Sequence, residues 1–283
     1  MPTPALFSPK FVERFVQQGF ATADIPQSAA DRFREAFQAG AEFFKADSAD
    51  KMTARLPRDG GYRPFGVEFS ASPSRPDEME SFTFSHRSVE TQIQLFAQAK
   101  TLHGAMCALF ASIEPMVEEL TLRAADRLKG TSGAVDFTGS FKDWSLLQLN
   151  YSRPSSTSAD FINDLHEDGC LMTVMTVTGP GLELLVANGT FVPMQPTDRL
   201  LFMSGEILNL LSGGTIPAIH HRVRPVRGLA ERMSMLFFAD MNPAVCKPWL
   251  LTPHNISVDI GRRVLTNSSR FGLAEWNNEP NPA

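Results

Sequence analysis

Apolar residues recur at helical spacing in two stretches of the first half of the chain. In residues 29–44 they return every three or four positions, which is typical of an amphipathic helix. The repeating positions there are Phe33, Phe37, Ala41 and Phe44. A second helix is expected from about Val89 to about Leu128, and Pro115 is expected to kink it or divide it in two. Its apolar positions are Leu95, Leu102, Met106, Leu109, Phe110 and Ile113.

The pattern changes in the second half of the chain. Short apolar runs rich in β-branched residues alternate there with turn residues, which predicts strands. The predicted strands are 144–151, 171–177, 182–186, 190–192, 199–203 and 233–238. Asn188-Gly189 lies between two of these runs and predicts a hairpin with a two-residue turn. Short, regularly spaced strands of this kind predict an antiparallel sandwich or barrel.

Helices therefore come first and strands follow, which predicts an α+β fold with helices on one side of an antiparallel double sheet. We expect residues 1–140 to form a helical and loop region packed on the core, and residues 141–245 to form the core that carries the chemistry. The C-terminal segment 246–283 contains Phe271 and Trp276. It is expected to be a lid over the core or a surface helix packed on the first half.

The composition is that of an ordinary globular protein of 283 residues, with 43% apolar and 20% charged residues. A formal net charge of −5 argues against the basic face that nucleic-acid binding requires. The sequence shows neither a signal peptide nor an apolar stretch of membrane-spanning length. Three widely spaced cysteines, Cys107, Cys170 and Cys246, do not make a disulfide framework. We therefore expect a cytoplasmic protein that binds neither membranes nor nucleic acid.

The tripeptide His166-Glu167-Asp168 is the first candidate for chemistry. In a strand, residues two positions apart point to the same side, so His166 and Asp168 can reach one ion while Glu167 points away. Taken alone, the same tripeptide also fits a solvated loop. Two imidazoles and one carboxylate, however, form the ligand set expected for a non-haem Fe(II) oxygenase.

The second imidazole comes from the pair His220-His221. Alternation along a strand lets only one of them share a face with the apolar Ile219 and Val223, and that one is His221. A histidine in such a strand also fits a hydrogen-bonded position in the core. The combination with His166 and Asp168 favours a metal ligand.

Arg232 and Ser234 form the third element, again two positions apart on a predicted strand. A cation and a hydroxyl on one side of a strand can bind the carboxylate of a small molecule. The alternative is an internal salt bridge between the arginine and an Asp or Glu of the chain.

With these motifs the chain resembles the isopenicillin N synthase-like branch of the Fe(II)/2-oxoglutarate-dependent dioxygenases. The resemblance rests on His166-x-Asp168 and on the segment 213–223, which ends in His221-Arg222-Val223. It also rests on Arg232-x-Ser234, which follows His221 after ten intervening residues. Less specific landmarks are Gly19-Phe20, Phe43-Phe44, Gly61-Tyr62, Phe65-Gly66 and Asn150-Tyr151.

The resemblance implies a double-stranded β-helix, or jelly roll, as the core, flanked by N-terminal helices. It implies that Fe(II) is held by His166, Asp168 and His221, which are thereby the catalytic residues. The implied reaction consumes O2 and 2-oxoglutarate, releases succinate and CO2, and hydroxylates a small molecule of the kind found in secondary metabolism.

The resemblance also implies where the co-substrate 2-oxoglutarate binds. Its 5-carboxylate is expected on Arg232 and Ser234, and Asn150 is a further candidate for binding the co-substrate. Many members of the family have a tyrosine that contacts the co-substrate where this chain has Ser152. That contact is therefore expected to differ here.

Candidates for the mouth of the substrate pocket are chosen by position alone. They are Tyr62, Arg63, Phe65, Phe82 and Gln148. The phenylalanines fit core packing equally well, and Arg63 fits either a contact to an acidic group or a surface charge.

Two further functions stay open for the whole chain. One is an iron-dependent cyclase, desaturase or oxidase, and the other is a non-catalytic β-barrel that binds a metabolite.

Overall fold

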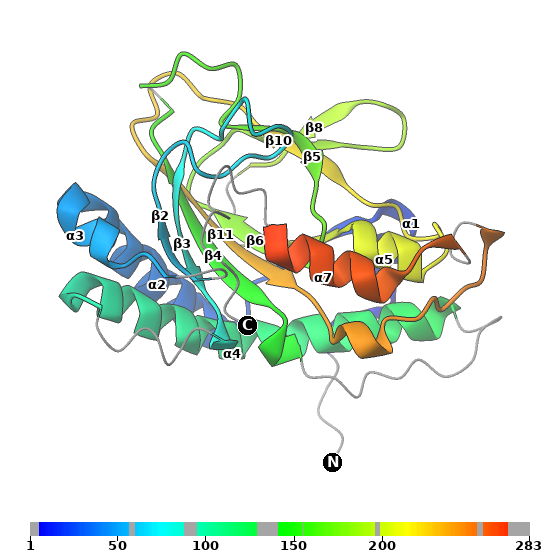
Figure 1. Ribbon diagram of the computed structural model, residues 1–283. Coiled ribbons are helices and arrows are strands. Elements are labelled where there is room, and N and C mark those ends of the chain that lie inside the picture. Colours follow the sequence, from blue (N-terminus) through cyan, green and yellow to red (C-terminus); the bar gives the residue numbers. More distant parts are fainter. Residues whose placement is uncertain are drawn as a thin grey trace.

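The computed structural model describes residues 6–56, 60–87, 95–128, 141–154, 156–195, 199–253 and 257–270. Two antiparallel sheets lie face to face, and helices cover the outer face of the larger one (Figure 1). The larger sheet has the order β1-β9-β6-β11-β4-β3-β2, and the smaller has the order β5-β10-β7-β8. The predicted α+β arrangement with an antiparallel double sheet is confirmed.

The bounds of the elements are as follows. The strands are β1 (Phe20–Asp24), β2 (Gly61–Arg63), β3 (Glu80–Phe84), β4 (Leu146–Ser152), β5 (Asn163–Glu167), β6 (Met172–Val177), β7 (Leu182–Leu185), β8 (Phe191–Pro193), β9 (Arg199–Ser204), β10 (His220–Val223) and β11 (Arg232–Ala239). The helices are α1 (Pro9–Gln18), α2 (Gln27–Lys45), α3 (Ser48–Thr53), α4 (Ala97–Leu128), α5 (Glu206–Leu211) and α7 (Ile260–Arg270). Short 3-10 turns are η2 (Phe141–Asp143) and η3 (Pro243–Val245).

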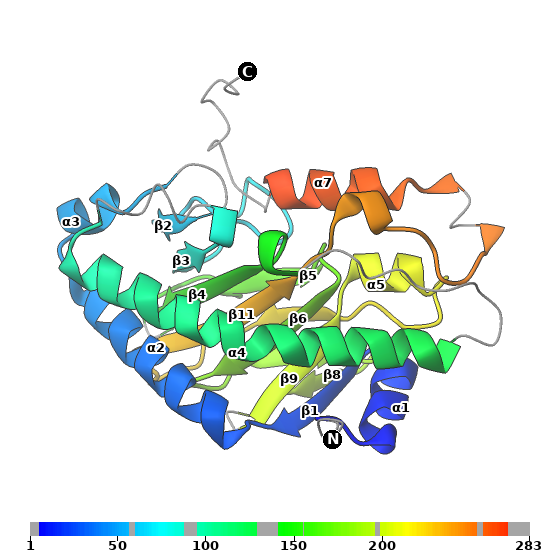
Figure 2. The ribbon, with the colours of Figure 1, turned by 90° about the horizontal axis from the view of Figure 1, so that it is seen from below.

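The two long helices are those that the apolar spacing predicts. Figure 2 shows α2 and α4 crossing the outer face of the larger sheet. Gly40 lets α2 come close to β4, because a Cβ atom at this position would overlap the Leu149 side chain. Pro115 lies inside α4 without dividing it, and the expected start near Val89 lies outside the described residues.

Alternation along the strands of the larger sheet separates two apolar layers. On β11, Met235 and Phe237 belong to the layer under the helices. Leu236 belongs to the layer between the two sheets. One face of the larger sheet thus packs against the helices, and the other face packs against the smaller sheet.

The hairpin of β7 and β8 forms where Asn188-Gly189 predicts it, but the prediction of a two-residue turn is wrong. The Val186 N–H donates to the Thr190 carbonyl over 3.0 Å, and the Gly189 N–H donates to the Val186 carbonyl over 2.8 Å. Residues 187–189 therefore make a three-residue loop. Gly189 has φ 78°, which is the left-handed conformation that this type of loop needs.

Several short elements lie outside the sequence predictions, namely α1, β1, α3, β2, β3 and α5. β3 shows the reason, because all five of its residues are buried and three of them, Glu80, Ser81 and Thr83, are polar. Phe82 and Phe84 alternate with Ser81 and Thr83, but so short a segment with three polar residues has no apolar run to mark it as a buried strand. Through β1, β2 and β3, residues 1–140 also contribute strands to the larger sheet.

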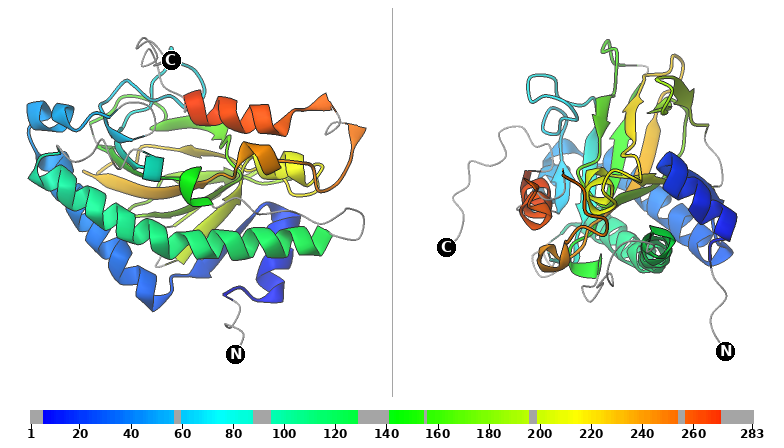
Figure 3. Two further views of the ribbon diagram at one scale, coloured as in Figure 1. Left: turned by 60° about the horizontal axis from the view of Figure 1, so that its bottom comes forward. Right: turned by 90° about the vertical axis from the view of Figure 1, so that its right-hand side faces the viewer.

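The C-terminal helix α7 lies beside α5 (Figure 3). Arg263 of α7 donates to both carboxylate oxygens of Glu206 at the start of α5, with distances of 2.6–3.1 Å. Phe271 and Trp276, the residues of the expected lid, lie outside the described residues. Among the helices of the described segments, none combines the length and the apolar character that crossing a bilayer requires.

Candidate metal and co-substrate site

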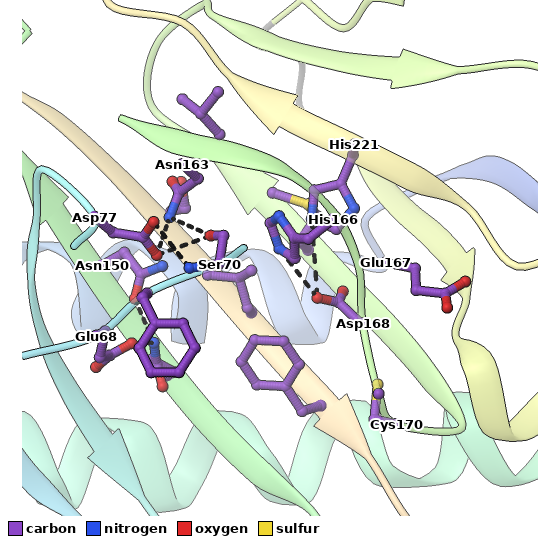
Figure 4. Close-up of a pocket in the computed structure, with 18 of the residues that line it drawn as sticks. Glu68, Ser70, Asp77, Asn150, Asn163, His166, Glu167, Asp168, Cys170 and His221 are labelled. Atoms are coloured by element: carbon purple, nitrogen blue, oxygen red, sulfur yellow. Dashed lines mark hydrogen bonds and ion pairs between the residues drawn. The ribbon is translucent and has the colours of Figure 1, made fainter. Parts of the chain in front are cut away.

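Three side chains from two neighbouring strands come together between the sheets (Figure 4). His166 lies on β5, Asp168 follows directly after β5, and His221 lies on β10. One ligand atom from each lies within 4.8 Å of the other two. Asp168 Oδ1 is 3.6 Å from His166 Nε2 and 3.9 Å from His221 Nε2. Two imidazole nitrogens and one carboxylate oxygen suit Fe(II) and leave coordination positions open.

The pairing of β5 with β10 sets this geometry. His166 lies opposite His221, and their ring centroids are 4.3 Å apart. The register shifts between this pair and the next one, Val223 with Asn163, so β5 carries a β-bulge. The extra residue brings Asn163 to the same side as His166, and both line one cavity.

Backbone carbonyl groups orient the two imidazole rings. His166 Nδ1 lies 2.6 Å from the Asp164 oxygen, and His221 Nδ1 lies 3.4 Å from the Ile219 oxygen. A proton on Nδ1 in each ring leaves the lone pair on Nε2, which is the tautomer that a metal ligand at that atom needs. Burial lowers the pKa of His221 to about 4, so this ring is neutral at physiological pH.

Asp168 is held from two directions. Its Oδ2 accepts a hydrogen bond from the Thr173 hydroxyl on β6, and its backbone oxygen accepts the Glu206 N–H over 2.9 Å. Burial alone would raise the pKa of Asp168. The electrostatic influence of the neighbouring His221 and His166 rings and the hydrogen bond from Thr173 outweigh it and lower that pKa well below the ordinary value. The group is therefore a carboxylate at physiological pH.

Arg232 and Ser234 lie on the cavity side of β11. The Arg232 Nε–H donates to the Pro180 carbonyl over 3.1 Å, and Nη1 donates to Ser234 Oγ over 2.6 Å. Nη2 is buried without a hydrogen-bond partner in the described part of the chain, and no carboxylate there pairs with this guanidinium. Burial lowers the pKa of Arg232 to about 10. The described residues thus do not show the alternative of an internal salt bridge, and the free donor suits the carboxylate of a small molecule.

A cavity of about 360 Å³ joins these features. The three candidate ligands His166, Asp168 and His221, together called the metal group, line it with Ser234. The rest of the lining has an apolar part and a polar part. The apolar lining is Phe69, Met79, Met175, Leu182, Val223, Leu236 and Phe238. The polar lining includes Glu68, Ser70, Asp77, Gln148, Asn150, Asn163 and Asp240.

Residues 144–240 match the family model of the 2OG-Fe(II) oxygenase superfamily. This segment holds the strands β4–β11, the metal group and the Arg232-x-Ser234 pair. The segment 144–240 belongs to the 2OG-Fe(II) oxygenase superfamily. The expected oxidoreductase with Fe(II), 2-oxoglutarate and O2 is confirmed at this level.

Solved structures share the fold of this oxygenase. A full-length Neurospora crassa protein in complex with alpha-KG matches with a TM-score of 0.73 and 17% sequence identity, over 92% of this chain and 89% of that one. Dioxygenase for auxin oxidation 1 from Arabidopsis thaliana, in its 2-oxoglutarate complex, matches with a TM-score of 0.63 and 19% identity, over 85% and 90% of the two chains. These likenesses confirm the expected jelly-roll core. No curated protein matches the chain.

The oxygenase places its predicted co-substrate residues along β4 and β11. Asn150 lies opposite Ser234, and Ser152 lies opposite Arg232. Asn150 lines the cavity, and its Oδ1 accepts a hydrogen bond of 2.8 Å from Gln148. The Ser152 hydroxyl donates to the backbone oxygen of Arg232 over 3.4 Å and is not part of the lining.

Of the five substrate candidates, the oxygenase brings only Gln148 to the lining of this cavity. Tyr62 and Phe82 are buried in the layer under the helices, where both rings pack against Phe43. Phe65 is 42% exposed. Arg63 is buried and donates to Thr83 over 2.6 Å, so it is an internal charge rather than a surface one.

Several lining residues of the oxygenase were missed from the sequence. Ser70 and Asp77 belong to the Gly- and Pro-containing loop before β3, where polar residues are the rule and carry no signal of burial. Asn163 reaches the cavity through the bulge in β5. Asp240 directly follows β11, where the alternation that includes Arg232 and Ser234 points to the cavity and was a usable signal.

Proposed function

We propose that the protein is a 2-oxoglutarate-dependent hydroxylase of a small molecule, in the isopenicillin N synthase-like branch of its superfamily. The observation that carries the proposal is the buried Arg232 guanidinium, whose Nη2 has no partner among the described residues, beside a cavity that also holds the His166–Asp168–His221 group. The spacing of His221-Arg222-Val223 and Arg232-x-Ser234 supports the placement in that branch.

In this proposal, His166, Asp168 and His221 hold Fe(II), and Arg232 and Ser234 hold the distal carboxylate of 2-oxoglutarate. When bound, the iron supplies the redox chemistry that couples oxidative decarboxylation of 2-oxoglutarate to oxidation of a C–H bond. The protein fixes the positions. Hydrogen bonds from Thr173 to Asp168 and from His166 to the Asp164 carbonyl keep the ligand atoms oriented before any metal arrives.

The apolar lining between the two sheets has its own part in the proposed reaction. Met175, Leu182 and Leu236 are almost completely buried and offer no hydrogen bonds to water. A dry wall of this kind strengthens the attraction between Arg232 and a bound carboxylate. It also limits side reactions of an activated site with solvent.

The size of the cavity supports a small molecule as substrate. A volume of about 360 Å³ lies at the lower end of the usual range for ligand sites. Among the similar structures, the Neurospora crassa protein was also solved with thymine and with 5-formyluracil, each together with alpha-KG. That protein thus binds a small ring compound together with alpha-KG.

The test is succinate formation from 2-oxoglutarate in the presence of Fe(II) and O2, together with calorimetric titration of the metal. We expect His166→Ala, Asp168→Ala and His221→Ala each to abolish turnover and to weaken metal binding strongly, because the open three-ligand geometry is lost. His220→Ala is the matched control, since this exposed neighbour points away from the cavity.

Retained iron-dependent succinate production in any of the three variants would contradict the ligand assignment. Once a substrate is found, succinate and hydroxylated product should form in equal amounts. Substrate oxidation without succinate would favour the alternative of an iron-dependent oxidase or cyclase on the same fold.

A further inference from the structure

Asp77 is a buried carboxylate in the wall of the cavity. Asp77 is only 6% exposed and lies in the loop before β3. It accepts hydrogen bonds from the Ser70 N–H over 3.1 Å, from the Ser70 hydroxyl over 2.8 Å and from Asn163 Nδ2 over 2.9 Å. All three donors are neutral, and no Lys or Arg of the described segments pairs with this group.

The position of Asp77 relative to the metal group is visible in Figure 4. Asp77, Ser70 and Asn163 form one hydrogen-bonded cluster, and His166, Asp168 and His221 form another across the cavity. Asp77, His166, Asp168 and His221 all line this one cavity. A group bound at Asp77 is therefore close to the proposed reaction centre.

Two other carboxylates of the lining, those of Glu68 and Glu206, differ from Asp77 in having a cationic partner. Glu68 has the Arg63 guanidinium at 3.6 Å and accepts hydrogen bonds from Ser81 and Gln148. Glu206 has its partner in Arg263. Each of these charges is already compensated inside the protein. Arg63 is likewise engaged, which removes the candidate that the sequence offered for binding an acidic substrate.

When Fe(II) and 2-oxoglutarate are bound, one negative charge remains uncompensated in the lining of the cavity. With the proposed ligands in place, the charges of Fe(II) and Arg232 balance those of Asp168 and 2-oxoglutarate. Asp77 and Asp240 then remain as buried acids of the lining without an ion-pair partner in the described part of the chain. Burial raises the pKa of Asp240 well above its ordinary value and holds it neutral, so Asp77 is the one that carries the charge. Burying an uncompensated charge is costly, and a cationic ligand would remove that cost.

Two further acceptors point to a ligand with hydrogen-bond donors. Asn163 uses its amide nitrogen on Asp77, and its carbonyl oxygen has no partner among the described residues. Asp240, which lines the same cavity and is 5% exposed, has an Oδ1 atom without any hydrogen-bond partner in those residues. The same cavity also has an apolar lining.

From these contacts we infer that the prime substrate is a small amine, whose ammonium group binds Asp77 and the Asn163 carbonyl oxygen and whose hydrocarbon part lies against the apolar lining. This inference rests on the proposed function, because it concerns the second substrate of the same site. Asp77 is then the residue that selects an amine over an alcohol or an acid of the same shape.

The experiment uses matched probes on one hydrocarbon skeleton at a time, namely a primary amine, the alcohol and the carboxylate, across a series of short linear and ring skeletons. Binding is measured by calorimetry under nitrogen to the protein loaded with Fe(II) and 2-oxoglutarate. We expect the amine to bind best and the carboxylate worst on each skeleton that fits. Asp77→Asn should weaken amine binding by roughly ten- to a hundredfold, as expected for loss of a charge-assisted hydrogen bond. It should leave binding of the alcohol nearly unchanged.

Glu78→Gln is the matched control, since it removes the same charge from the next residue, which is not part of the lining. Amine binding that survives Asp77→Asn, carboxylates that bind as well as amines, or a series in which no amine binds would each overturn the inference. The ranking of the three probes on the unaltered protein decides the question even if the variant does not fold. Wild-type succinate formation separates the two levels: turnover of 2-oxoglutarate without amine binding overturns only the substrate class, and absence of turnover overturns the proposed function itself.

Discussion

The buried carboxyl group of Asp77 is expected to lower the stability of the folded protein at neutral pH, and this effect can be measured at a single residue. Burial raises its pKa from 3.8 to about 6, so the folded protein holds this proton more tightly than the unfolded chain does. The associated stabilisation is fully present below pH 3.8 and is lost as the pH rises through 6. At neutral pH the ionised Asp77 therefore opposes folding.

Comparison of the wild type with Asp77→Asn isolates this effect, because all other titrating groups are shared. As the pH rises from below 4 to above 6, we expect the wild type to lose about 3 kcal/mol of unfolding free energy relative to the variant. Urea unfolding at a series of pH values measures this difference. A gap between the two proteins that stays constant with pH would show that Asp77 titrates normally and is not held as a buried charge.

Among the short elements, α5 fixes the loop that carries Asp168. The backbone N–H groups of Gly205 and Ile207 donate to the carbonyls of Leu171 and Cys170, each over 3.1 Å, and the intervening N–H of Glu206 donates to Asp168. Gly205 allows this approach, since a Cβ atom there would overlap the Cys170 oxygen and lie 2.7 Å from the Asp168 oxygen. The start of α5 thereby acts as a rigid support for the proposed metal ligand.

Gly205→Ala is expected to displace this loop, because its neighbours are backbone atoms that cannot rotate aside. We expect a loss of about 1–3 kcal/mol in stability, as for other overpacked sites. Metal affinity should fall about tenfold or more, as when an outer-shell support is lost. Thermal unfolding and calorimetric metal titration give the two quantities. Gly104→Ala is the control, as it lies inside α4 with open space around it and should be neutral or slightly stabilising. Normal metal binding in Gly205→Ala would show that α5 does not position Asp168.

The elements also show which parts of the site the sequence could predict. Arg232 with Ser234, and His221 rather than His220, follow from strand alternation, and the structure brings these side chains to the same region. Asn163 does not follow from it, because strict alternation would put it on the opposite face from His166 and only the β-bulge brings both to the cavity. Asp77 and Ser70 depend on the path of a loop, which no local pattern encodes. Tyr62 and Phe82 were placed near the mouth by position, whereas β2 and β3 turn them towards the helices.

Across the whole molecule, the proposed ligands connect the two sheets. His166 and His221 come from strands of the smaller sheet, and Arg232 and Ser234 come from β11 of the larger one. The outer face of the larger sheet is already covered by α2 and α4, so the space between the sheets is where binding can add to the stability of the fold. Fe(II) and 2-oxoglutarate together should therefore act as a clamp between the layers.

The stabilisation that these ligands give the folded state follows from their concentration relative to Kd. A ligand at a hundred times its Kd stabilises the folded state by about 2.7 kcal/mol, which for a chain of this length corresponds to a rise in Tm of about 5 °C. We expect 2-oxoglutarate to produce such a rise under nitrogen in the presence of Fe(II). Arg232→Met should lose the part that depends on 2-oxoglutarate and keep the part that depends on the metal, since the metal group is intact. Arg199→Met, which removes an exposed arginine paired with Asp24, should keep both. A 2-oxoglutarate shift that survives in Arg232→Met would mean that another group binds the co-substrate, and Arg232 would then be an unpaired buried cation with no assigned partner.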